Sequence, residues 1–241
     1  MEMKTSAIVL HALKYGESQL IVDLFTRDAG RVSFFCHLPK SNKGKIKKQL
    51  FQHLTLLEVV FDYRPQASMQ RFRDLRLAKP FGSVPFDPVK LSISLFLAEF
   101  LNYATRNEQQ NELLYDYVED SLLWLDNVSE QYANFHLVFM MRLSRFIGFF
   151  PNLAESDAHQ WFDLRNSVFT AVRPPHPDYL EPAEASRIAL LMRMNYKNMH
   201  LFRMSQAERN RCVEIILNYY RLHVPGFPEM KSLPVLQTLF R

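Results

Sequence analysis

The first eighty residues consist of short β-patterned segments separated by turn residues, with no helical periodicity between them. The segments cover residues 6–13, 19–27, 31–37, 54–63 and 69–79. In the third segment, Val32, Phe34 and Cys36 fall on one face, and Arg31, Ser33, Phe35 and His37 fall on the other, outward face. Because no crossover helix separates them, five such strands favour a small closed barrel of the OB-fold type over a parallel α/β sheet.

The pattern changes after residue 80, where Pro80, Pro85 and Pro88 fall within nine residues. We therefore expect an OB-fold domain over residues 1–80 and a mainly α-helical domain over 81–241, an α+β chain overall. Asp87 and Pro88 are typical of an N-cap followed by a first-turn proline.

Helical periodicity then predicts a series of helices and one small β-hairpin in the second half. The helices are expected at residues 88–101, 110–126, 131–149, 183–194 and 205–220, and the hairpin at 161–172. Ser129 is the expected cap of the third helix, and Ser205 with Glu208 matches a capping box at the last.

Composition excludes several classes of protein. The chain has only two cysteines, Cys36 and Cys212, so neither a disulfide framework nor a four-cysteine zinc site can form. Apolar runs are interrupted by charges well before the roughly 20 residues of a membrane span, and no signal peptide is apparent. We expect a cytoplasmic protein that does not enter the membrane.

Positive charge is concentrated at the front of the chain. Residues 1–80 hold 14 Lys/Arg against 7 Asp/Glu, a net charge of +7, whereas residues 81–241 hold 15 against 18, a net charge of −3. This asymmetry favours a polyanionic partner for the β-domain. The densest run is a loop between the third and fourth strands that contains Lys40, Lys43, Lys45, Lys47 and Lys48.

Lysines on a loop contact phosphates as point charges, so binding there would be sequence-neutral and salt-dependent. Phe35 and His37 on the outward face of the third strand could stack on unpaired bases. The candidate DNA-binding set is completed by Arg31, Arg71 and Arg73. The alternative is a lysine run kept for solubility, with Phe35 buried under the second domain.

Catalytic motifs are missing from the sequence. Gly44-Lys45 is followed by Ile46 and preceded by Pro39 five positions earlier, which rules out a P-loop. No G-x-S-x-G elbow or H-E-x-x-H pair occurs, and the histidines show no metal-ligand spacing. We expect a binding protein without cofactor or metal, not an enzyme.

One helical face combines Phe139, Arg142, Arg145 and Phe146 at three- and four-residue steps. Two guanidinium groups beside apolar side chains suit an acidic peptide that ends in a hydrophobic residue. The alternative is a packed helix whose arginines pair with internal acids.

The N-terminal run resembles the opening of RecO-family recombination mediators. Its parts are Ala7-Ile8-Val9-Leu10-His11, Tyr15-Gly16-Glu17-Ser18, Val22-Asp23-Leu24-Phe25-Thr26 and Gly30-Arg31-Val32, with Gly148-Phe149-Phe150-Pro151 and Lys231-Ser232-Leu233 downstream. The resemblance implies an OB-fold followed by a helical domain. It also implies binding of single- and double-stranded DNA, strand annealing, and RecA loading together with RecR and single-stranded-DNA-binding protein.

The resemblance places the acidic tail of single-stranded-DNA-binding protein near Arg142. Many family members carry a zinc motif after the G-F-x-P segment, but residues 152–160 contain no cysteine here, so we expect no metal. An RNA- or ribosome-associated OB-fold protein is the alternative, because a lysine loop would serve it equally well.

Overall fold

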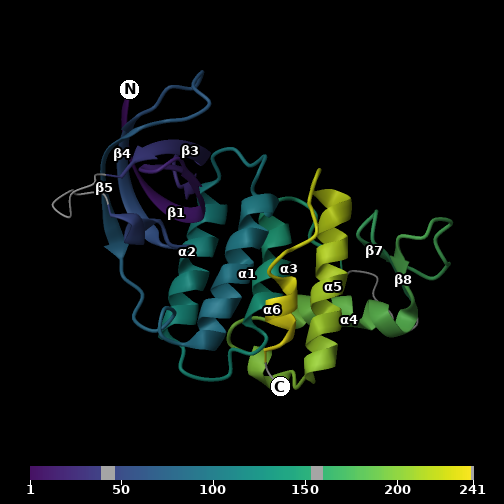
Figure 1. The fold of residues 1–241 in the computed structure, drawn as a ribbon. Coiled ribbons are helices and arrows are strands. Elements are labelled where there is room, and N and C mark those ends of the chain that lie inside the picture. Colours follow the sequence, from purple (N-terminus) through teal and green to yellow (C-terminus); the bar gives the residue numbers. More distant parts are fainter. Residues whose placement is uncertain (39–46, 153–159, 240–241) are drawn as a thin grey trace. The chain divides into compact units, whose positions relative to one another are not determined.

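The structure is a computed structural model that describes residues 1–38, 47–152 and 160–239. The chain folds into two compact units (Figure 1). The first comprises residues 1–127 and 230–236, and the second comprises 128–229 and 237–241. The expected boundary at residue 80 coincides with the end of the last barrel strand. As a border between independently folding domains it stays a prediction.

The N-terminal sheet is antiparallel and five-stranded, with the order β3-β2-β1-β4-β5. Its strands are β1 (Glu2–Tyr15), β2 (Gln19–Thr26), β3 (Gly30–His37), β4 (Leu56–Asp62) and β5 (Phe72–Lys79). A short 3-10 helix, η1 (Lys48–Phe51), precedes β4. The expected OB-type barrel is confirmed, as are the two faces of β3, since Val32, Phe34 and Cys36 are buried in its core.

Backbone hydrogen bonds between β3 and Gln70, two residues before β5, close the barrel. Phe35 N–H donates to Gln70 O at 2.9 Å, and Gln70 N–H donates to Ser33 O at 2.8 Å. Inside, the ring of Phe34 stacks on Phe72 at 4.2 Å between centroids. The edge strands of the sheet thereby meet, which removes two unpaired edges at this point.

Two helices complete most of the first unit, α1 (Pro88–Ala104) and α2 (Glu112–Asn127). The Asp87 side chain caps α1 by accepting from Val89 N–H at 2.8 Å and Lys90 N–H at 3.1 Å, as the sequence predicted. Glu99 of α1 accepts the backbone N–H groups of Lys231 and Ser232, each at 2.8 Å, which ties the C-terminal segment to this unit.

The second unit is mainly helical with a small sheet of order β7-β6-β8. Its elements are α3 (Phe135–Phe146), β6 (Trp161–Asp163), β7 (Val168–Thr170), β8 (Tyr179–Leu180), α4 (Pro182–Arg193), η2 (Met199–Leu201) and α5 (Gln206–His223). The last helix, α6 (Leu233–Gln237), belongs to the first unit except for Gln237. The hairpin expected at 161–172 is confirmed as β6 and β7. The additional pairing of β6 with β8 was not anticipated.

The third helix begins later than the sequence pattern indicated. Gln131 has a φ of 64°, in the left-handed region, so a helix cannot run through it. The helix starts after Asn134 instead of being capped by Ser129, and it ends at Phe146, shortly before Gly148 with a φ of 93°. The expectation of one helix over 131–149 was therefore too long at both ends.

Candidate nucleic-acid interface

The outward face of the first three strands is covered by helices at one end. Phe25 is fully buried there, and its ring lies 5.9 Å from that of Tyr115 in α2. Arg31 donates to Asp23 Oδ2 at 3.1 Å and to Asn102 Oδ1 at 2.8 Å, and its side chain is only 15% exposed. The Arg31 guanidinium is thus bound to internal partners and lies at the border of the accessible surface.

The other end of the same face is open. Tyr15 is 56% exposed, and its ring meets the half-buried ring of Phe35 edge to face at 6.2 Å. His37 is exposed, and Gln19 pairs with both Tyr15 and His37 in the strand register. We call Tyr15 and Phe35 the aromatic pair. Tyr15 was missed by sequence reasoning because it stands at a turn, far from Phe35 along the chain.

Barrel closure joins the backbone of Phe35 to the chain just before β5, which carries two arginines around its start. The carbonyl that accepts from Phe35 N–H belongs to Gln70, so the exposed Arg71 follows directly along the chain. Arg73 lies further along and has acidic partners, with Nη1 at 2.5 Å from Glu2 and Nε at 2.8 Å from Asp62. Hydrogen bonds to these two carboxylates raise the pKa of Arg73. Arg71 is therefore the better placed of the two to meet a phosphate.

A polar pocket of about 300 Å³ lies between β3 and the loop that joins β4 to β5. Its lining includes the exposed residues Arg64 and Arg106 together with Ser33 and Gln70. The Arg106 guanidinium also lies 5.2 Å from the centroid of the Tyr103 ring. OB-folds bind oligonucleotides on the face of strands 2 and 3 and on the loop between strands 4 and 5, so this pocket adjoins the expected path. Sequence reasoning missed both arginines, which stand in no basic run.

The lysine-rich loop is only partly described. Lys47 and Lys48 are exposed at the start of η1, whereas Lys40, Lys43 and Lys45 lie outside the described residues. Of the lysine-rich loop, the structure therefore shows only the two exposed lysines at η1 in the first unit.

The candidate peptide face on α3 belongs to the second unit. Phe139 is fully buried in its core, and Phe146 is half-buried. Arg142 donates from Nε at 3.1 Å and from Nη2 at 2.9 Å to Met194 O, the C-cap carbonyl of α4. Arg145 is exposed and lies 5.2 Å from the centroid of the Phe150 ring. Of the four residues expected at this face, Arg145 is the most accessible.

The described residues include neither a metal-ligand cluster nor a cysteine thiol of lowered pKa. No group of three or more His, Cys, Asp or Glu side chains among them is placed to hold a metal ion. Burial raises the pKa of Cys36 to about 11 and also raises that of Cys212, so both thiols stay protonated near neutral pH. Within the described chain, no helix has the length and apolar character needed to cross a membrane.

Two family models match successive parts of the chain. "Recombination protein O N terminal" matches residues 1–81, and "Recombination protein O C terminal" matches residues 85–234. The chain is 51% identical over 241 residues to a protein of Bacteroides fragilis named DNA repair protein RecO. Proteins of the same name from Phocaeicola vulgatus and Flavobacterium psychrophilum are 50% and 34% identical, and in all three cases both chains are covered completely.

Proposed function

Because this chain belongs to the RecO family of DNA repair proteins, we propose that it binds single- and double-stranded DNA through its barrel and anneals complementary strands. The observation that carries the proposal is the open end of the barrel face, where the Tyr15–Phe35 pair lies on the surface that OB-folds use for oligonucleotides. Gln70, the backbone partner of Phe35, directly precedes the exposed Arg71. Aromatic side chains stack on unpaired bases of any identity, and arginines neutralise the backbone.

Annealing by such a surface requires no catalytic group. Lysines and arginines neutralise phosphates, which lowers the repulsion between two strands held on the same protein. Stacking on the aromatic pair keeps bases from pairing with other bases of their own strand. Pairing with a complementary strand then releases them from the protein. The proposed DNA-contacting set is Phe35, His37, Lys40, Lys43, Lys45, Lys47, Lys48, Arg71 and Tyr15, with Arg31 and Arg73 at its border and Arg64 and Arg106 in the adjoining pocket.

In the cell, we place this activity in the bacterial cytoplasm at the nucleoid, in recombinational repair. The proposed partners are RecR, with which the protein would load RecA onto single strands, and the acidic C-terminal tail of single-stranded-DNA-binding protein. For that tail we retain the face of α3, where the exposed Arg145 would pair with a carboxylate. Arg142 and Phe146 lie beside it, whereas Phe139 would support the face from the core.

The decisive experiment replaces the aromatic pair. The double variant Tyr15→Ala, Phe35→Ala is expected to bind a fluorescent single-stranded oligonucleotide at least about fivefold more weakly, because stacking contributes roughly 1–3 kcal/mol per base. Binding to a duplex should change less, since its bases are already stacked. Phe86→Ala is the matched control, because Phe86 is 80% exposed and outside the proposed surface.

Unchanged single-strand affinity in the double variant, measured by anisotropy alongside a melting curve, would refute the stacking role. Competition between DNA and RNA strands of the same sequence tests the nucleic acid itself. A preference for RNA would favour an RNA-associated role instead.

A further inference from the structure

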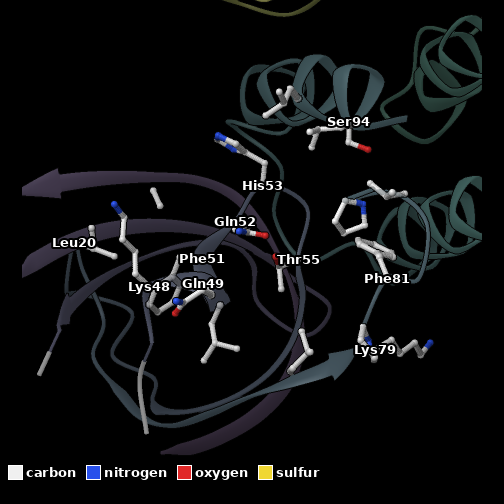
Figure 2. A pocket seen from close by; sticks show the side chains of 18 of the residues that line it. Leu20, Lys48, Gln49, Phe51, Gln52, His53, Thr55, Lys79, Phe81 and Ser94 are labelled. Carbon is white, nitrogen blue, oxygen red and sulfur yellow. The ribbon is translucent and has the colours of Figure 1, made fainter. Parts of the chain in front are cut away.

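A cavity of about 870 Å³ opens within the first unit, beside η1. Its walls come from β1, β2, η1 and the segment between η1 and β4 on the barrel side, and from the end of β5, the segment after it and α1 on the other. In Figure 2, Lys48 and Phe81 stand on the left and right of the view, with His53 and Ser94 above. The volume lies within the roughly 300–1,000 Å³ typical of ligand sites. The proposed DNA-contacting surface does not include this cavity. Lys48 is the one residue of the proposed DNA-contacting set that also lines the cavity among the described residues.

Large apolar side chains are left exposed in the cavity. Leu77 is 43% exposed, and Leu91 and Leu95 are each 41% exposed. Leu91 and Leu95 are four residues apart on α1, so they project from the same face of the helix. A cluster of exposed leucines in a concave site marks a surface that binds a partner.

Three lysines line the same cavity as these leucines, and no carboxylate stands among the described residues that line it. The lysines are Lys14, Lys48 and Lys79. Lys79 Nζ lies 3.2 Å from Glu119 Oε2, so part of its charge is neutralised. Lys14 and Lys48 are exposed and leave the rim positively charged. The cavity is therefore complementary to a ligand that combines negative charge with apolar groups.

We propose that this cavity docks an extended acidic peptide of a partner protein, with aliphatic side chains against the leucines and carboxylates at Lys14 and Lys48. Most apolar residues of the lining are aliphatic, and of its two phenylalanines Phe51 is buried in the barrel core. Sites for unpaired bases rely on exposed aromatic side chains, so a peptide fits better than a DNA strand. In addition, the stretch of β1 that contributes Ala12 and Lys14 pairs with β2, and no second strand pairs with it among the described residues. An extended peptide could add to that edge through main-chain hydrogen bonds.

The test uses the full-length chain and a fluorescein-labelled peptide of alternating aspartate and leucine. A labelled peptide of alternating aspartate and serine is the matched control. The leucine peptide should bind by anisotropy and the serine peptide at least about tenfold more weakly, because each leucine side chain removes apolar surface from water when it packs in the cavity. Leu95→Glu should weaken leucine-peptide binding at least about tenfold. Leu113→Glu is the matched control, since Leu113 is also on an exposed helix position, is 73% exposed and does not line the cavity.

Single-strand DNA binding by Leu95→Glu is measured in parallel, and melting curves confirm that both variants fold. Weakened peptide binding with unchanged DNA binding supports a separate peptide site, whether or not the aromatic pair proves to bind DNA. Equal binding of both peptides, or equal peptide binding by Leu95→Glu and the native chain, would overturn the proposal. The proposal would also be overturned if DNA displaced the peptide and Leu95→Glu bound the peptide and DNA equally weakly, because the cavity would then be a DNA-binding site.

Discussion

Among the described glycines, Gly30 has the least space for a side chain. Its φ is 64°, and a Cβ at this position would stand 2.6 Å from both the carbonyl carbon and oxygen of Gln109. Backbone atoms cannot rotate away as a flexible side chain would. The glycine at the β2–β3 turn thus allows the segment that precedes α2 to approach the barrel closely.

Gly30→Ala should accordingly destabilise the protein by about 2–4 kcal/mol, because left-handed strain and a backbone clash act together. Gly226→Ala is the matched control, since Gly226 has a φ of 69° but no atom within 4 Å of the position that an added methyl group would take. Its cost should be limited to about 1–2 kcal/mol. Urea unfolding measures both, and equal losses would show that the contact with Gln109 contributes nothing.

Asp126 links the end of α2 to the segment before α1. Its carboxylate accepts the backbone N–H groups of Gly82 and Ser83 at 2.8 Å and that of Val84 at 2.9 Å. Partial burial opposes its ionisation, but these three donors outweigh burial and hold the pKa of Asp126 below its ordinary value of 3.8. The folded state therefore favours the carboxylate more strongly than the unfolded chain does.

Because the pKa is lower in the folded state, this stabilisation is complete above about pH 4 and is lost as the pH falls through the folded-state pKa. Asp126→Asn should lower the free energy of unfolding by about 1–3 kcal/mol at pH 7. The difference from the native chain should shrink below pH 4. Denaturant unfolding across this range measures it, and a difference independent of pH would contradict the assignment.

At the scale of elements, the two helices α4 and α5 begin in different ways. Ser205 and Glu208 form the predicted capping box, with Ser205 N–H donating to Glu208 Oε2 at 2.8 Å and Glu208 N–H donating to Ser205 Oγ at 3.3 Å. Glu181 precedes α4 without a side-chain capping bond. Of these two helices, only α5 therefore depends on a side chain to satisfy its first N–H groups.

Ser205→Ala should cost about 1 kcal/mol of unfolding free energy, the usual value for an N-cap. Glu181→Ala, the matched helix start without a cap, should change it by less than about 0.5 kcal/mol. Thermal melts of both variants provide the measurement. A loss in Glu181→Ala as large as that in Ser205→Ala would mean that capping does not explain the difference.

For the whole molecule, affinity for DNA should depend on the asymmetric charge of the chain. A variant in which Lys43, Lys45, Lys47 and Lys48 are all changed to Glu should lose DNA binding with little change in melting temperature. The reason is that each lysine contributes to affinity by contacting phosphates rather than by packing. Lys197→Glu is the control, an exposed lysine of the second unit.

A salt titration of single-strand binding should show affinity that falls steeply and linearly on logarithmic axes. A slope near zero, or binding that survives the four substitutions, would contradict phosphate contact by the loop.

Strand pattern and local caps could be predicted from the sequence, whereas contacts between distant residues could not. Alternation in β3 separated Val32, Phe34 and Cys36 from the outward residues, because a strand reverses its side chains at every step. The Ser205 cap was equally local. Helix α3 shows the limit of such reasoning, since the backbone turn at Gln131 left no mark in the apolar pattern.

The sequence by itself determined the strands, most helix starts, the basic front half and the resemblance to RecO. Only the tertiary structure decided that Tyr15 meets Phe35, that Arg31 is bound to Asp23 and Asn102, and that Leu77 joins Leu95 around one cavity. The physical reason is that periodicity and capping act between neighbours along the chain, whereas these contacts join residues that only barrel closure and helix packing bring together.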